Sequence, residues 1–321
     1  EFHYLHHQPD GTPYDDPNAM SHALVAAAEE AGIRLTLLDT CYLSSGFGEP
    51  PQGVQRRFSD GDVDRWCERV AALPSTGRAR HGAAVHSVRA VPPEAMPTIA
   101  AWAADRPLHA HVSEQVAENE ACLARHGTTP TGVLADRGVL GPRTTAVHAT
   151  HLTDEDVDLL ARSGTTVDFC PTTERDLGDG IGPGRRLHRA GVALTIGSDS
   201  HAVIDPFEEM RALEVDERLA TQERGHWTAA ELLRVATTDG HASLGWDDAG
   251  SITVGQRADL VTLATDTART AGTGADEHTA VFAATAADVT HVVVDGRVVV
   301  REGDPGQVGR ELEEVVGTLW S

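Results

Sequence analysis

The regular alternation of short apolar segments with amphipathic helical segments is the feature that most constrains the fold. It runs from residue 33 to residue 222, and a further strand end is predicted at residues 1–4. Strand–helix alternation predicts a parallel sheet covered by helices. The predicted strands are residues 33–42, 81–90, 107–115, 144–152, 165–173 and 192–200.

The order of the predicted elements favours an α/β fold of the (β/α)8 TIM-like barrel type. Polar residues gather where the predicted strands end, and barrel sites lie at that face. The alternative is a doubly wound open sheet, but no GxGxxG motif follows any predicted strand. Two helices are well marked: one between Thr153 as N-cap and Gly164 as C-cap, and an acidic one over 207–217. The acidic helix is expected to present a solvated face and an apolar inner stripe.

The pattern changes after about residue 247, where Gly-rich turns separate β-rich segments without helical alternation. The sequence therefore predicts two domains, a barrel over 1–247 and a small β-sandwich unit over 248–321. A closing helix is predicted around 307–319.

Composition excludes several classes of partner. The formal net charge of −23 argues against nucleic acid and anionic membranes, which need clustered Lys and Arg. The four cysteines are scattered without a CxxC pair, as expected in a reducing compartment. No apolar run reaches the ~20 residues of a membrane span, and no signal peptide is visible. The sequence predicts a cytoplasmic protein with a small-molecule substrate.

The segment LHAHVSEQ, residues 108–115, contains the first candidate site. His109 and His111 are two residues apart on a predicted strand, so both side chains point to the same face. Such a pair is suited to chelating a metal, although the pattern is short and common. Glu114 follows, and a carboxylate there could move the proton of a metal-bound water.

Two further polar residues end later strands. His148 ends the strand in TTAVHATHL, and Asp199 lies in the Gly- and Ser-rich turn of TIGSDSHA. Taken singly, His148 fits a hydrogen-bonded polar residue and Asp199 an Asx-turn former. Carboxyl ends of parallel strands meet at one rim, so together they indicate a metal-dependent hydrolytic site.

This order of motifs resembles the amidohydrolase superfamily, whose barrel enzymes bind one or two divalent metals and hydrolyse C–N bonds. Members carry an HxH pair on the first strand. Only three predicted strands follow the strand of His109 up to Asp199, whereas seven would follow a first strand, so His111 corresponds to the fifth-strand ligand. The first-strand HxH is expected to precede Glu1, and the barrel is expected to be N-terminally incomplete.

Longer segments resemble the family of formimidoylglutamate deiminases within this superfamily. They are EFHYLHHQPDGTPY, QRRFSD, HSVRAVPPE, HVSEQ, CPTTERDLGDGI and IGSDSHAVIDPFEEMRALE. The resemblance implies zinc-dependent hydrolysis of N-formimidoyl-L-glutamate to N-formyl-L-glutamate and ammonia in histidine degradation. The sequence departs from the family at Arg175 and Asp176, where smaller or neutral residues are usual.

The resemblance also implies residue roles. His111 and Asp199 would ligate one zinc ion, for which iron, nickel or manganese could substitute. Glu114 would relay the proton and His148 would polarise the tetrahedral centre, so Glu114, His148 and Asp199 form the predicted catalytic set. The residues predicted to contact substrate are Tyr4, His86 and Arg89. A structural ion pair is the alternative reading of Arg89. His3, His6 and His7 are expected in pocket or supporting roles.

Two other functions stay open. The first is another amidohydrolase deaminase acting on a guanine-like or other heterocyclic amine, which an aromatic stacking cage would favour. The second is a truncated, non-catalytic barrel used for binding or assembly. Enzymes of this kind are often dimers, so a homodimer is expected.

Overall fold

A seven-stranded sheet forms the centre of the computed structural model, which describes residues 1–303 and 308–318. All strands are parallel and neighbour one another in chain order. They are β1 (Phe2–His3), β2 (Leu35–Cys41), β3 (Ala79–Val85), β4 (Leu108–Val112), β5 (Thr144–His148), β6 (Thr166–Phe169) and β7 (Leu194–Ile196). Consecutive parallel strands joined through helices are the arrangement of a (β/α) barrel, so the predicted fold class is confirmed.

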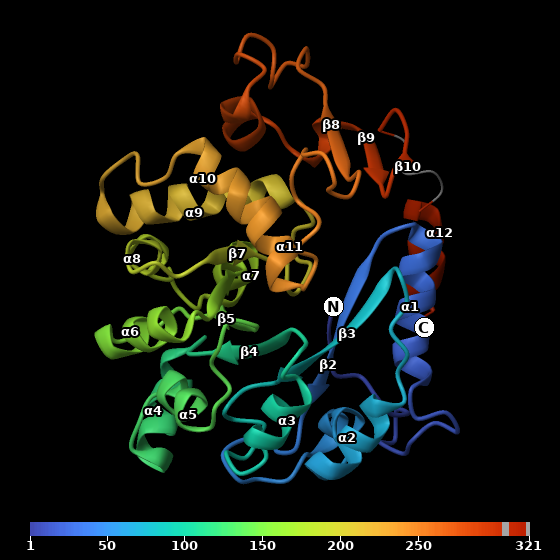
Figure 1. Ribbon diagram of the computed structural model, residues 1–321, viewed down its shortest axis with the longest axis vertical. Helices are drawn as coiled ribbons and strands as arrows, with labels where there is room; N and C mark the ends of the chain where they lie inside the picture. The colour runs from blue at the N-terminus through green and yellow to red at the C-terminus, as the bar shows by residue number, and fades with distance from the viewer. Residues whose placement is uncertain (304–307, 319–321) are drawn as a thin grey trace.

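Helices surround the curved sheet, as Figure 1 shows. They bury one continuous core in which Trp66, Leu134 and Leu160 are fully enclosed. The helices of the barrel are α1 (Ala19–Ala31), η1 (Gly53–Phe58), α2 (Val63–Ala71), α3 (Met96–Trp102), α4 (Val116–His126), α5 (Pro130–Asp136), α6 (Asp154–Ser163), α7 (Pro171–Leu177), α8 (Gly184–Arg189), α9 (Pro206–Thr221), α10 (Ala229–Arg234), η2 (Val235–Asp239) and α11 (Gly240–Ser243).

Helix α6 has the ends that the sequence predicts. The Thr153 hydroxyl accepts a hydrogen bond from the backbone N–H of Asp156, and the Asp156 carboxylate accepts one from the backbone N–H of Thr153. This reciprocal capping box satisfies two N–H groups that the helix leaves unpaired. Gly164 closes the helix with a φ of 72°, in the left-handed region that glycine adopts without strain.

The strand predicted over 165–173 is too long. It ends at Phe169, and Pro171 begins α7 because its fixed φ suits the first helical position. The prediction for the acidic helix was also wrong in part, since Glu209 and Glu214 of α9 are buried. Glu209 accepts two hydrogen bonds from Thr172, which explains how a carboxylate can lie on the inner face.

The C-terminal part contains a three-stranded antiparallel sheet in the order β10-β9-β8. Its elements are β8 (Leu260–Leu263), η3 (Thr279–Ala283), η4 (Ala286–Asp288), β9 (Val289–Val294), β10 (Arg297–Val300) and α12 (Val308–Gly317). Arg34, just before β2, is ion-paired with Asp259 and Asp295, which ties this sheet to the barrel. Parts of the predicted closing helix, residues 307 and 319, lie outside the described residues.

Across residues 1–303 and 308–318, no helix combines the length and apolar character needed to cross a membrane.

Candidate active site

A cavity of about 990 Å³ lies against the inner side of the seven-stranded sheet. It extends from the carboxyl ends of the strands down to deeper side chains such as Leu38 and Thr195. All residues that the sequence predicts for catalysis, metal binding or substrate contact line this one cavity: Tyr4, His86, Arg89, His111, Glu114, His148 and Asp199. The structure therefore brings the predicted set together.

His109 and His111 both line the cavity, as their spacing on β4 predicts. His109 lies deeper, with Nε2 at 3.3 Å from the backbone carbonyl of Ser243. His111 stacks between Phe2 and His148, at ring-centroid distances of 4.2 and 5.4 Å. Burial holds the pKa of His111 well below its ordinary value. Its imidazole is therefore neutral, the form in which histidine ligates a metal.

His148 ends β5 among three carboxylates. Its Nδ1 lies 3.2 Å from Glu174, while Nε2 lies 3.9 Å from Glu114 and 4.0 Å from Asp199. Burial disfavours the charged ring, but the hydrogen bond to Glu174 and the surrounding negative charges outweigh burial, so the pKa of His148 is raised. The cationic form is thereby favoured at this position.

The backbone is left-handed at several of these strand ends. The φ angle is 50° at Ser113, 68° at His148 and 39° at Asp199. Residues other than glycine adopt this region at an energetic cost, and such residues cluster at functional sites. The side chains of His148 and Asp199 at these turns line the cavity.

Glu114 faces His148 on one side and Arg89 on the other. The Arg89 Nη2 donates a hydrogen bond of 3.2 Å to Glu114, and Arg89 Nε lies 3.6 Å from Glu118. Burial raises the pKa of Glu118 to about 7. Arg89 fits both predictions made for it. It lines the cavity, as a substrate-contacting residue would, and it also forms ion pairs with Glu114 and Glu118.

Aromatic side chains form one wall of the cavity. Phe2, Tyr4 and Phe58 all line it, and the Tyr4 ring meets Phe58 edge to face at 5.0 Å. His86 packs against Tyr4 at 5.2 Å. Burial lowers the pKa of His86 to about 3, so this ring is neutral and offers both a donor and an acceptor.

Two carboxylates at the site were not predicted. Glu174 on α7 accepts a 2.8 Å hydrogen bond from the backbone N–H of Cys170 and orients His148. Asp168 on β6 lines the cavity, and burial raises its pKa to about 7. An acidic residue inside the apolar strand TVDF was the available signal for Asp168. For Glu174 the only signal was its place in the first turn after Pro171.

His111 and Asp199 fit a divalent metal by donor type, because zinc takes neutral imidazole and carboxylate ligands. Both line the same cavity. Among residues 1–303 and 308–318, three ligand-type side chains with donor atoms within 4.8 Å of one another occur only at Asp276, Glu277 and His278, so the cavity side chains are not gathered that closely. These three are exposed and lie outside the cavity. The case for His111 and Asp199 as candidate metal ligands rests on their donor types and on their place in one cavity.

Comparison with curated proteins gives relatives over almost the whole chain. Formimidoylglutamate deiminase of Pseudomonas aeruginosa is 38% identical over 99% of this chain and 74% of its own length. A 5′-deoxyadenosine deaminase of Methanothermobacter thermautotrophicus is 31% identical over 91% of this chain and 68% of its own length. Both names describe hydrolytic removal of nitrogen from a carbon atom.

Solved structures give the same picture. An amidohydrolase from Brucella melitensis superposes with a TM-score of 0.91 at 33% identity, over 100% of this chain and 74% of that one. An adenosine deaminase from Xanthomonas campestris, solved with bound zinc, gives a TM-score of 0.80 at 25% identity, over 93% and 70%. The sequence model of the amidohydrolase family matches residues 10–299. The chain belongs to the amidohydrolase family, and the prediction of a hydrolase that acts on C–N bonds is confirmed at that level.

Proposed function

We propose that this protein is a zinc-dependent deiminase that hydrolyses N-formimidoyl-L-glutamate to N-formyl-L-glutamate and ammonia, a step of histidine degradation. The observation that carries the proposal is the position of Glu114, which lies between Arg89 and His148 in one cavity. A proton-transfer group is thus adjacent both to a cation that suits a carboxylate substrate and to the ring expected to polarise the reacting carbon. The similarity to the Pseudomonas aeruginosa deiminase supports the same substrate.

His111 and Asp199 are the side chains that would hold the ion. A bound divalent ion supplies positive charge that makes water acidic near neutral pH and polarises the reacting bond. Iron, nickel or manganese would suit the same donors. Asp199 lies 4.0 Å from His148, so the ligand and the polarising ring face the same point.

Glu114 would act as the proton carrier. The water oxygen forms a bond to the formimidoyl carbon, and Glu114 accepts the proton that the water loses. Glu114 passes that proton to the terminal nitrogen. The remaining proton of the added hydroxyl then moves by way of Glu114 to the same nitrogen as the formyl C=O forms, the C–N bond breaks, and ammonia leaves. Its Oε1 is 3.9 Å from His148 Nε2, and a substrate atom between them would be within reach of both groups.

His148 would stabilise negative charge that develops during water addition. Glu174 holds Nδ1, so the proton on Nε2 points into the cavity. The raised pKa of His148 keeps that ring a donor, and a fixed donor in a buried site stabilises a transition state more than one in water does.

Arg89, His86 and Tyr4 would recognise the glutamate part of the substrate. An arginine can bind a carboxylate through two parallel hydrogen bonds. A substrate carboxylate would replace Glu114 as a partner of Arg89, which would free Glu114 for proton transfer. Binding and activation would then be coupled through one side chain.

The aromatic wall favours a second candidate substrate class, a nucleoside such as a 5′-deoxyadenosine. Phe2, Tyr4 and Phe58 provide faces on which a purine could stack. The chemistry at Glu114 and His148 would be the same, because a deaminase also adds water to a carbon bonded to nitrogen.

Ammonia release by the zinc-loaded protein distinguishes the two substrates. N-formimidoyl-L-glutamate, 5′-deoxyadenosine and 5′-methylthioadenosine are compared at equal enzyme concentration. We expect kcat/KM for formimidoylglutamate to exceed that for both nucleosides by at least about two decades, as buried polar recognition allows. Faster release from a nucleoside would replace the proposed substrate by the second candidate.

A further inference from the structure

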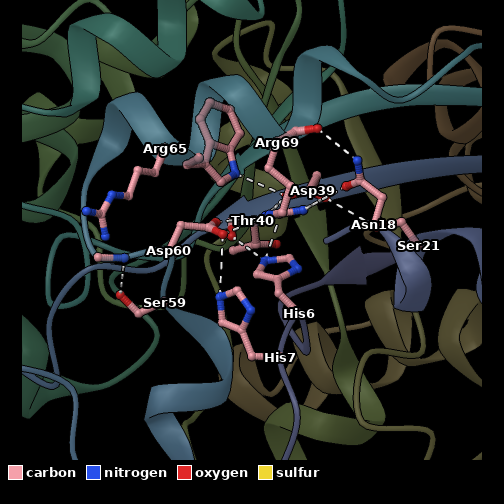
Figure 2. Close-up of polar contacts among 12 residues, drawn as sticks. His6, His7, Asn18, Ser21, Asp39, Thr40, Ser59, Asp60, Arg65 and Arg69 are labelled. Atoms are coloured by element: carbon pink, nitrogen blue, oxygen red, sulfur yellow. Dashed lines mark hydrogen bonds and ion pairs between the residues drawn. The ribbon is translucent and has the colours of Figure 1, made fainter. Parts of the chain in front are cut away.

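A buried ion cluster lies next to His6 and His7, which directly follow the cavity-lining residues at the start of the chain (Figure 2). It consists of Asp39 on β2, Arg69 on α2 and Asp60. Arg69 donates two hydrogen bonds of 2.8 Å to Asp39 and two of 2.9 Å to Asp60. None of the three lines the cavity. The catalytic steps described above do not use this cluster.

The cluster holds the start of the chain. His6 Nε2 lies 3.0 Å from the Thr40 carbonyl and 3.7 Å from Asp39, and His7 Nε2 lies 3.5 Å from Asp60. Figure 2 shows both rings pointing toward the two carboxylates. Burial lowers the pKa of His6, so its ring is neutral and Nε2 donates its proton to the carbonyl.

The backbone next to these rings is fixed as well. The N–H groups of His6 and His7 both donate to the Arg57 carbonyl, at 2.9 and 3.0 Å. In return, Arg57 Nε donates to the His7 carbonyl at 3.2 Å. The segment is thus attached through its rings and its main chain.

The other half of the same segment forms the cavity wall. Phe2, His3, Tyr4 and Leu5 line the cavity directly before the two anchored histidines. Strand β1 contains only two residues, and no helix or strand covers residues 4–18. The wall residues are therefore held on one side by a short strand and on the other by His6 and His7.

Stability alone does not explain an ion cluster at this place. Asp39 is fully buried and the Arg69 side chain is 4% exposed, so both charges are removed from water. Replacing such a pair by apolar residues of similar volume is often neutral or stabilising. What apolar side chains cannot supply is a carboxylate acceptor for the His7 ring and a carboxylate beside the His6 ring.

We propose that Arg69 is a positioning residue for substrate binding. It orients Asp39 and Asp60, these carboxylates fix His6 and His7, and the fixed histidines hold Tyr4 and Phe2 in the cavity wall. The effect on substrate binding rests on the function proposed above, whereas the effect on the segment does not.

The test compares Arg69→Met with Arg65→Met, a matched control four residues earlier on the same helix, where the side chain is 72% exposed. Hydrogen–deuterium exchange is measured for the peptide covering residues 2–8. We expect exchange to accelerate ~10-fold in Arg69→Met and not in Arg65→Met, with α6 unchanged in both. For formimidoylglutamate, KM should rise ~5- to 10-fold in Arg69→Met while kcat changes less than ~2-fold.

A purely structural role would lower the folded fraction but leave the KM of the folded molecules unchanged. Asp60→Asn provides a milder variant, since it keeps the Asp39–Arg69 pair and the side-chain shape; smaller changes of the same sign are expected. Three results would each overturn the proposal. The first is a folded Arg69→Met variant whose exchange equals that of the wild type, and the second is an unchanged KM despite faster exchange. The third is failure of both variants to fold. If the wild-type protein does not act on formimidoylglutamate, the proposed function fails, and the exchange result still decides whether Arg69 positions the segment.

Discussion

Two histidines of the cavity have opposite charge preferences because their surroundings differ. His111 is packed among other rings, and burial lowers its pKa. His148 is equally enclosed but lies next to three carboxylates, and its pKa is raised. A neutral ring suits a metal ligand and a charged ring suits a polarising donor. The roles proposed for the two residues therefore follow from their neighbours.

The substitution Glu114→Gln tests the proposed role of Glu114 as the proton carrier. The amide keeps the size of the side chain but cannot accept a proton, so turnover should fall by about 10²- to 10⁴-fold. Zinc content should stay unchanged, because Glu114 is not a proposed ligand. Ammonia release and zinc analysis are measured together, with the exposed Glu120→Gln as control. Near-normal turnover in Glu114→Gln would remove Glu114 from the mechanism.

Arg89→Met tests substrate recognition. Loss of a charge-assisted hydrogen bond costs about 1.5–3 kcal/mol, so kcat/KM for formimidoylglutamate should fall by roughly one to two decades. A small formimidoyl compound without carboxylates should be affected much less. Equal losses on both compounds would assign Arg89 to its ion pairs with Glu114 and Glu118.

Much of the site could be predicted from sequence because parallel strands place their carboxyl ends at one rim. His111, Glu114, His148 and Asp199 are each at or just beyond a strand end. Glu174 and the pairing of Arg89 with Glu118 could not be predicted. Both depend on how a helix packs against the strand ends, and residue spacing along the chain does not determine that packing.

At the scale of elements, each strand predicted in the barrel is present. The helices between the strands follow the predicted alternation less closely, because the structure has short helices that were not predicted. Helix α5 and helix α7 were missed because each has only seven residues, fewer than the roughly 11–18 residues over which helical periodicity can be recognised. The buried Glu209 and Glu214 of α9 look like surface residues in the sequence. Their partners are backbone and hydroxyl groups of Thr172 and Trp227, which are distant along the chain.

Packing of the helices on the sheet predicts a contrast between two leucines. Leu160 on α6 is fully buried, whereas Leu219 on α9 is 74% exposed. Leu160→Ala should lower the free energy of unfolding by about 2–5 kcal/mol, because it leaves a cavity. Leu219→Ala should change it by less than about 0.5 kcal/mol. Urea unfolding of both variants checks this, and equal effects would contradict the core described for α6.

At the scale of the whole molecule, the net charge of −23 contrasts with the cluster in which the carboxylates of Asp39 and Asp60 are both paired with Arg69. For Asp39 and Asp60, burial raises the pKa, but the charge and hydrogen bonds of Arg69, with the His7 hydrogen bond to Asp60, outweigh burial, so both values lie below the ordinary one. Their contribution to stability is present above the unfolded-state pKa of about 3.9 and is lost as pH falls below it.

Acid unfolding should therefore depend on this cluster. The urea midpoint of the wild-type protein should fall between about pH 5 and pH 3, and Asp60→Asn should show a weaker dependence over that range. Asp64→Asn, which changes an exposed carboxylate four residues later, on α2, should behave like the wild type. A pH dependence that is the same in Asp60→Asn and the wild type would show that Asp60 is not held in its charged form by the fold.

The most direct test of the proposed function is hydrolysis of N-formimidoyl-L-glutamate by the zinc-loaded protein in water enriched in ¹⁸O. The mechanism adds the oxygen of water to the formimidoyl carbon and releases the terminal nitrogen. It predicts one ammonia for each N-formyl-L-glutamate formed, with ¹⁸O in the formyl group of the initial product. Absence of this product, or a formyl group without the label, would contradict hydrolytic deimination at this site.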